Sequence, residues 1–193
     1  MNHSRRTALM RATVAAWFAV SGLATAFAAR AQGTSALPTE LDSELPGLQK
    51  LGSARMRFFG FDIYEARLWV GSSFKPEAYA ATPFALELNY LRSLNGKAIA
   101  ERSLKEMQRQ GGFGAEQEKA WLAAMVRTFP DVKAGDRIVG AHFPGTGARF
   151  WFNGQSLPAI RDADFSRVFF GIWLADASSE PQLRASLLGR SAS

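Results

Sequence analysis

The chain has 193 residues, a formal charge of +6 and no cysteine, which excludes disulfides, a thiol nucleophile and thiolate metal sites. Four arginines and no acidic residue lie within residues 1–31, so removing that segment would lower the formal charge from +6 to +2. The remainder intersperses both signs of charge and has no basic stripe that could follow a phosphate backbone, so nucleic acid is not an expected partner.

The N-terminus has the pattern of a cleavable export signal. Three arginines precede an uncharged run from Ala12 to Ala29, and the small-residue pattern Ala29-Arg30-Ala31 follows. Basic, apolar and small residues in this order are typical of such signals. We therefore expect residues 1–31 to be removed near Ala31 and the mature chain to act in a bacterial periplasm without a membrane span. The adjacent arginines fit both general and twin-arginine export.

The next segment, residues 32–50, is small and polar, and Pro38 and Pro46 break any periodicity. This composition predicts a flexible N-terminal segment ahead of the folded part. The folded part is expected over residues 51–190, which is close to the usual size of one domain. No internal repeat or second domain is found.

The first half of the domain indicates strands followed by helices. The aromatic stretch 55–70, with Gly60 in its middle, predicts two strands joined at a tight turn or one bent strand. Alternating apolar residues over 84–91 predict a half-buried strand. Helical patterns follow over 98–110 and 121–129, and glycines and a proline end them.

The second half repeats this order. Strands are predicted over 136–143 and 148–153, joined by Pro144-Gly145-Thr146-Gly147. Because a strand and not a helix follows these glycines, they indicate a hairpin turn and not a phosphate loop. Apolar residues at helical spacing predict a helix over 165–173, and a short helix is expected over 181–188. The whole order predicts an α+β fold, an antiparallel sheet covered on one side by helices.

Few side chains in the mature chain suggest catalysis or metal binding. His142 is its single histidine, and no Gly-x-Ser-x-Gly motif marks a partner serine, so a strand residue is the simpler interpretation. Asp162-Ala163-Asp164 lacks further oxygen ligands at loop spacing, and helix capping explains it. Neither a metal nor a cofactor is expected.

Three arginines, Arg55, Arg57 and Arg67, lie in the most aromatic stretch. An arginine turned into an apolar cleft needs an anionic partner, because an unpaired buried charge costs several kcal/mol. A ligand carboxylate or phenolate would supply that partner. In the alternative interpretation the arginines point outward or pair with Asp62 and Glu65.

Six short motifs follow one another along the chain, each weak alone: Leu51-Gly52-Ser53-Ala54-Arg55, Asp62 to Trp69, Leu94-Asn95-Gly96-Lys97, Phe129-Pro130 with Gly135, Phe165-Ser166, and Ser179 to Leu187. In this order they resemble, from Leu51 to Leu188, the bacterial exported branch of the chalcone isomerase fold. The resemblance implies an open-faced sandwich of a sheet and helices.

The resemblance also implies site residues. In the plant enzymes an arginine holds the phenolate that closes the flavanone ring, and it corresponds best to Arg55, with Arg57 as the alternative. The serine or threonine beside the substrate corresponds to Ser166. The threonine position falls near Phe59, while the tyrosine and asparagine positions are Ile99 and Glu106, so three groups are missing.

Loss of the tyrosine hydroxyl removes a donor worth about 2 to 4 kcal/mol in comparable sites, which argues against isomerase activity. Non-catalytic relatives with this fold bind fatty acids. Together with the export pattern, the resemblance therefore implies a periplasmic domain without catalysis that binds a small apolar, acidic ligand such as a fatty acid or an aromatic acid. Arg55 would anchor the anion, and Phe59 and Tyr64 would line the cleft.

Two alternatives remain open. In the first, side chains such as Ile99 fill the cleft, and the domain docks onto another envelope protein. In the second, the domain is an isomerase or lyase for a non-flavonoid substrate with Glu106 as the acid or base. A cavity lined by Arg55 would favour ligand binding, and a filled core with an exposed apolar patch would favour docking.

Overall fold

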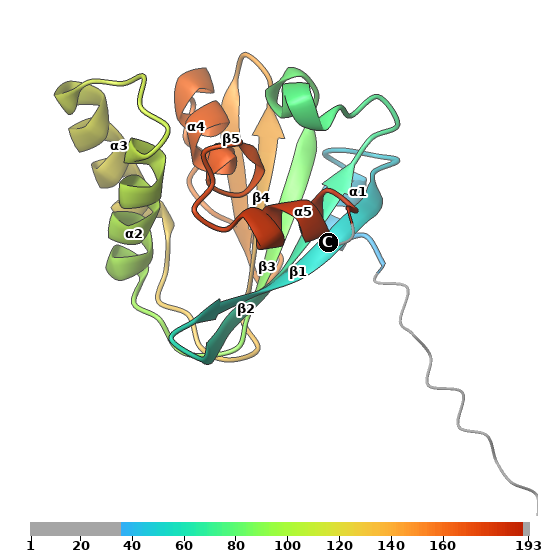
Figure 1. Cartoon of the computed structure of the whole chain (residues 1–193), viewed down its shortest axis with the longest axis horizontal. Coiled ribbons are helices and arrows are strands. Elements are labelled where there is room, and N and C mark those ends of the chain that lie inside the picture. Colours follow the sequence, from blue (N-terminus) through green and yellow to red (C-terminus); the bar gives the residue numbers. More distant parts are fainter. Residues whose placement is uncertain (1–35, 191–193) are drawn as a thin grey trace, which may run out of the picture. The chain divides into compact units, whose positions relative to one another are not determined.

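A computed structural model of the chain describes residues 36–190 (Figure 1). Within them, six strands form one antiparallel sheet in which spatial order follows chain order. The strands are β1 (Gln49–Phe58), β2 (Phe61–Val70), β3 (Phe84–Tyr90), β4 (Arg137–Phe143), β5 (Gly147–Phe152) and β6 (Gln155–Ser156). The helices are α1 (Thr39–Asp42), the 3-10 helix η1 (Pro76–Ala81), α2 (Gly96–Gln108), α3 (Ala115–Thr128), α4 (Ala163–Leu174) and α5 (Pro181–Leu187).

Helices α4 and α5 lie against one face of the sheet, α2 packs beside α4, and α3 packs on α2 (Figure 1). The main core forms between these layers, where Leu68, Phe84 and Phe150 of the sheet meet Phe165 and Phe170 of α4. All five side chains are buried. The predicted α+β class, with an antiparallel sheet and helices on one side, is confirmed.

Side-chain caps fix where two of these helices begin. Asn95 accepts a hydrogen bond from the Ala98 backbone N–H at 3.2 Å and so starts α2. Asp162 does the same for α4 through the Phe165 N–H at 2.9 Å, and its second oxygen accepts from Trp121 Nε1 at 2.8 Å. Asp162 is therefore a cap that also ties α3 to α4. Residues 36–190 contain no cluster of three or more acidic, histidine or cysteine side chains that could hold a metal ion.

Two glycines allow backbones to approach closely. At Gly52 in β1, a Cβ atom would overlap the carbonyl oxygens of Ser186 and Leu187, so α5 lies directly on the strand. At Gly96, the first residue of α2, it would overlap the carbonyl oxygen of Phe129 at the end of α3. The side chain is missing at both positions because backbone occupies its place.

The N-terminal segment differs from the flexible segment predicted over 32–50. From residue 36 onward it packs on the face of the sheet opposite the main helices, with Leu41 fully buried. A second core forms there, of Leu41, Leu45, Trp69, Ala85, Val139, Ala141 and Trp151. The sequence did not predict this packing, because single leucines separated by turn residues show no periodicity.

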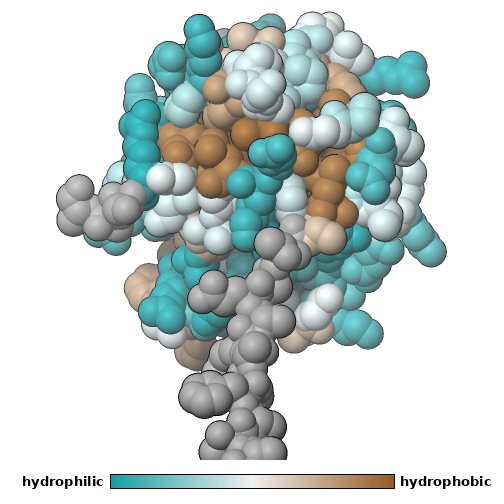
Figure 2. Space-filling view, turned by 90° about the vertical axis from the view of Figure 1, so that its right-hand side faces the viewer, coloured by the Kyte–Doolittle hydropathy of each residue, from teal (hydrophilic) through white to brown (hydrophobic). Residues whose placement is uncertain are grey.

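Ion pairs attach the same segment to the sheet. Glu40 pairs with Arg137 at 2.8 Å, and Glu44 pairs with Arg149. Figure 2 shows the right-hand side of the view in Figure 1, where hydrophobic residues lie at the surface between hydrophilic ones. None of the helices within residues 36–190 combines the length and the hydropathy that a membrane span requires. The predicted signal over 1–31 lies outside the described residues.

Candidate functional site

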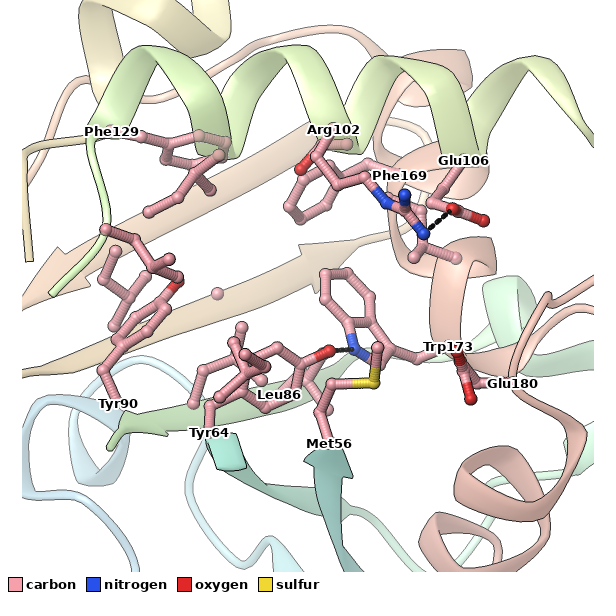
Figure 3. A pocket seen from close by; sticks show the side chains of 18 of the residues that line it. Met56, Tyr64, Leu86, Tyr90, Arg102, Glu106, Phe129, Phe169, Trp173 and Glu180 are labelled. Atoms are coloured by element: carbon pink, nitrogen blue, oxygen red, sulfur yellow. Dashed lines mark hydrogen bonds and ion pairs between the residues drawn. The ribbon is translucent and has the colours of Figure 1, made fainter. Parts of the chain in front are cut away.

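A cavity of about 270 Å³ lies between the sheet and helices α2, α4 and α5 (Figure 3). Almost all of its lining is aliphatic or aromatic. The residues come from the sheet and from the helices on one side of it: Met56, Phe58, Ile63, Tyr64, Leu86, Leu88, Tyr90, Leu94, Ala98, Ile99, Arg102, Ser103, Glu106, Phe129, Ile138, Gly140, Phe150, Phe169, Phe170, Ile172, Trp173, Ser179, Glu180 and Leu183.

Strand register builds the floor of the cavity. Tyr64 of β2 pairs with Met56 on one side and with Tyr90 on the other, so these three side chains form one row across the sheet. The next row across the sheet contains Leu86 and Gly140. A Cβ atom added at Gly140 would lie only 3.0 Å from the Phe150 ring. The missing side chain thus allows the rings of Phe150 and Phe170 to pack directly on the strand.

The two tyrosines of this floor remain neutral. Tyr64 accepts a hydrogen bond from Trp173 Nε1 at 3.0 Å (Figure 3), and burial raises its pKa to about 12. Burial also raises the pKa of Tyr90, to which the nearby Tyr64 contributes. No side chain or backbone group of residues 36–190 hydrogen-bonds to the Tyr90 hydroxyl. This hydroxyl is a free donor at the cavity wall.

Charged groups lie on the α2 side. Arg102 and Glu106, one turn apart, form an ion pair at 2.6 Å (Figure 3). The Glu106 side chain is 11% exposed, whereas that of Arg102 is half exposed and covers the Phe58 ring at 5.5 Å. Arg102 therefore neutralises Glu106, whereas Glu180, which also lines the cavity, forms no ion pair within residues 36–190.

Arg55 does not anchor a ligand in this cavity, which corrects the central expectation. Its neighbours Ala54 and Met56 face the helices, so alternation turns Arg55 to the opposite face of the sheet. There it pairs with Asp62 at 3.0 Å and with Glu65. These acids raise the Arg55 pKa, with the hydrogen bond to Glu65 as the main cause. The alternative interpretation, pairing on the surface, describes this arginine.

Two more expected site residues lie outside the cavity. Arg57 is exposed and pairs with Asp62 at 2.7 Å. Phe59 occupies the turn between β1 and β2 with its side chain in solvent. A register shift at Met56 and Arg57 and the tight turn move both residues away from the helices.

Ser166 is also absent from the cavity lining. It is fully buried on α4, where its hydroxyl donates to His142 Nδ1 at 2.7 Å. His142 Nε2 donates to the Ala80 carbonyl at 3.0 Å, and the ring stacks on Phe84. Burial lowers the His142 pKa. The pair is a satisfied core contact, as the strand interpretation of His142 expected.

Tyr64 and Ile99 are the expected site residues that do line the cavity. Sequence reasoning missed Arg102 and Ser103, although both lie within one helical turn of Ile99 and so share its face. It also assigned Trp173 to the core without a polar role. The helical spacing from Ile99 was the available signal for this site.

Comparisons with known proteins agree with this architecture. The chalcone isomerase-like family matches residues 29–189. A protein of Haemophilus influenzae is 30% identical over 145 residues, which are 75% of this chain and 70% of that protein. The crystal structure of a fatty-acid-binding protein of Arabidopsis thaliana has a TM-score of 0.56 at 11% identity, covering 74% of this chain and 87% of that one. The chain belongs to the chalcone isomerase-like family.

Proposed function

We propose that this domain binds a small, largely apolar ligand, without chemical turnover, in the cavity between the sheet and α2, α4 and α5. The observation that carries the proposal is the open, almost wholly apolar cavity itself. Its volume of about 270 Å³ exceeds the roughly 150 Å³ that accommodates benzene and lies just below the usual range of ligand sites. The similarity to a fatty-acid-binding protein supports this class of ligand.

An acidic head group would lie at the mouth of the cavity. Arg102 is the arginine among the lining residues, and its guanidinium already neutralises Glu106. A ligand carboxylate would share that cation, in partial contact with solvent, and would gain little from it. The apolar body of the ligand therefore supplies most of the affinity, through burial at about 25 cal/mol per Å².

Isothermal titration with decanoic acid and its methyl ester tests the proposal. We expect saturable binding of both probes, with affinities within about tenfold of each other because burial dominates. Ile99→Trp places a larger side chain in the cavity and should weaken both probes by more than about tenfold. Because it fills empty space, it should leave the melting temperature unchanged or raised.

Ala123→Trp is the matched control, since Ala123 is an exposed helical residue on α3 that does not line the cavity. It should bind both probes as the original chain does. Absence of binding by the original chain would refute the proposal. Unchanged binding by a folded Ile99→Trp variant would place the ligand elsewhere and favour the docking alternative, in which the cleft serves as core.

We also propose that the domain performs this role in the periplasm after export. The basic, apolar and small pattern of residues 1–31 supports this location. N-terminal sequencing of the protein recovered from the periplasmic fraction should find a start at or near Gln32. A soluble protein that begins at Met1 would contradict the proposed location without affecting the cavity.

A further inference from the structure

The turn between β1 and β2 carries an exposed aromatic cluster. We call residues 57–61, together with Leu91 and Arg92, the hairpin tip. Within it Phe58 is 44%, Phe59 85% and Phe61 61% exposed, and Leu91 is 38% exposed. Of the six large hydrophobic residues exposed among residues 36–190, these four lie at one end of the sheet. Such a concentration on a soluble domain marks an interaction surface.

Phe59 is held there against its backbone preference. Its φ angle is +48°, followed by Gly60 at +81°, as in a type I′ turn. Asparagine or glycine normally occupies the first of these positions, and a bulky residue with positive φ is an outlier. Strain of this kind is found mostly at functional sites. The benzyl group is thus presented to solvent at a cost in stability.

Arginines lie over two of the three aromatic rings. The Arg92 guanidinium lies 4.9 Å from the centre of the Phe61 ring, and Arg102 covers Phe58 at 5.5 Å. Arg57 projects from the tip with its side chain 68% exposed. The hairpin tip itself contains two arginines and no acidic residue. Its nearest acid, Asp62, is engaged by Arg55 and Arg57 on the opposite face of the sheet.

The hairpin tip also borders the mouth of the cavity. The lining residues that are exposed are Phe58, Ala98 and Arg102, and they belong to the end of β1 and the first turns of α2. In Figure 3 Arg102 extends from α2 toward Glu106 of the same helix. A surface that covered the hairpin tip would therefore face the entrance of the cavity.

We propose that the hairpin tip docks onto an anionic phospholipid surface, with Phe59 and Phe61 inserted below the head groups and Arg57 and Arg92 against the phosphates. Aromatic residues with arginines beside them suit the boundary between the acyl chains and the head groups of a bilayer. There the apolar and the anionic layers lie within one side-chain length of each other. Docking in this orientation brings the mouth of the cavity to the bilayer. The inference deepens the proposed function, because an apolar ligand could then pass between bilayer and cavity.

Vesicle flotation tests this interaction with two lipid compositions. The original chain should float with vesicles of equal parts phosphatidylethanolamine and phosphatidylglycerol, and far less with phosphatidylcholine vesicles. Phe59→Asn should bind the anionic vesicles at least about tenfold more weakly, because one inserted aromatic side chain is lost. The same change should raise the melting temperature, since Asn-Gly is favoured in a type I′ turn. Arg92→Gln should reduce binding to anionic vesicles only.

Val126→Asn is the matched control, because Val126 is 40% exposed on α3, away from the hairpin tip. It should float as the original chain does. Lipid docking is refuted if the original chain stays in solution with anionic vesicles. It is also refuted if sedimentation velocity shows that the hairpin tip only joins copies of the chain to one another. The proposed ligand site is tested separately, since Phe59→Asn should still bind decanoic acid normally. Loss of decanoic acid binding with vesicle binding intact would refute the ligand site alone.

Discussion

Replacing Gly96 with alanine should destabilise the fold by about 3 kcal/mol or more, a large cost for one added methyl group. That methyl would overlap the carbonyl oxygen of Phe129 and lie 2.7 Å from the carbonyl carbon of Pro130. Both are backbone atoms, so no side-chain rotation can relieve the overlap. The Gly96 N–H also donates to Asp131 at 2.8 Å, which fixes the start of α2 against the end of α3.

Urea unfolding followed by tryptophan fluorescence measures this effect. Gly114→Ser is the matched control, because Gly114 precedes α3 with open space where a Cβ would lie, and serine is the better cap. Its free energy of unfolding should be equal or higher. A Gly96→Ala variant as stable as the original chain would show that α2 can shift away from Phe129. Weaker decanoic acid binding is expected in any folded fraction, because α2 carries Ile99 and Arg102.

Glu87→Ala should cost about 3 kcal/mol, because it leaves several buried donors without their acceptor. Glu87 lies on the opposite face from the cavity and is 4% exposed. It accepts hydrogen bonds from Arg67 at 3.1 Å, Trp69 Nε1 at 3.0 Å and Asn89 at 3.0 Å. Arg67 is a quarter exposed and can recover some hydration, which keeps the loss below the upper end of the usual range.

The control for this variant is Glu101→Ala. Glu101 pairs with Lys97 at 3.6 Å across one turn of α2, and both side chains are more than half exposed. Such a pair contributes about 0.5 kcal/mol or less to stability. The thermal midpoint of Glu101→Ala should therefore barely differ from that of the original chain. A Glu87→Ala midpoint equal to that of the control would show that water replaces the lost carboxylate. Decanoic acid binding should survive in folded Glu87→Ala protein, since no residue of this cluster lines the cavity.

The order of elements and the buried helix faces could be predicted from the sequence. Local signals are sufficient for these features: Asp162 caps its helix, and Pro144 to Gly147 form a hairpin turn between strands. Ile99 was expected at the cleft from the family resemblance, as the residue at the tyrosine position, and it does line the cavity.

The phase of the first strand was not predictable in this way. Arg55 and Met56 alternate, and either residue could face the helices, because an arginine stem can pack on apolar surface as well as a methionine. Pairing with Asp62 and Glu65 decides the question. A shift of one residue exchanges the two faces of a strand. Arg55, expected to face the cleft, therefore lies on the opposite face of the sheet.

By itself the sequence determined the fold class, the family resemblance and the apolar character of the domain, because these depend on local pattern and composition. Only the tertiary structure decided where the cavity lies, since Met56, Ile99 and Phe169 meet there from three distant segments. It also decided that Leu41 seals the opposite face of the sheet. Contacts between residues far apart in the chain depend on packing in three dimensions, which leaves no periodic signal in a single sequence.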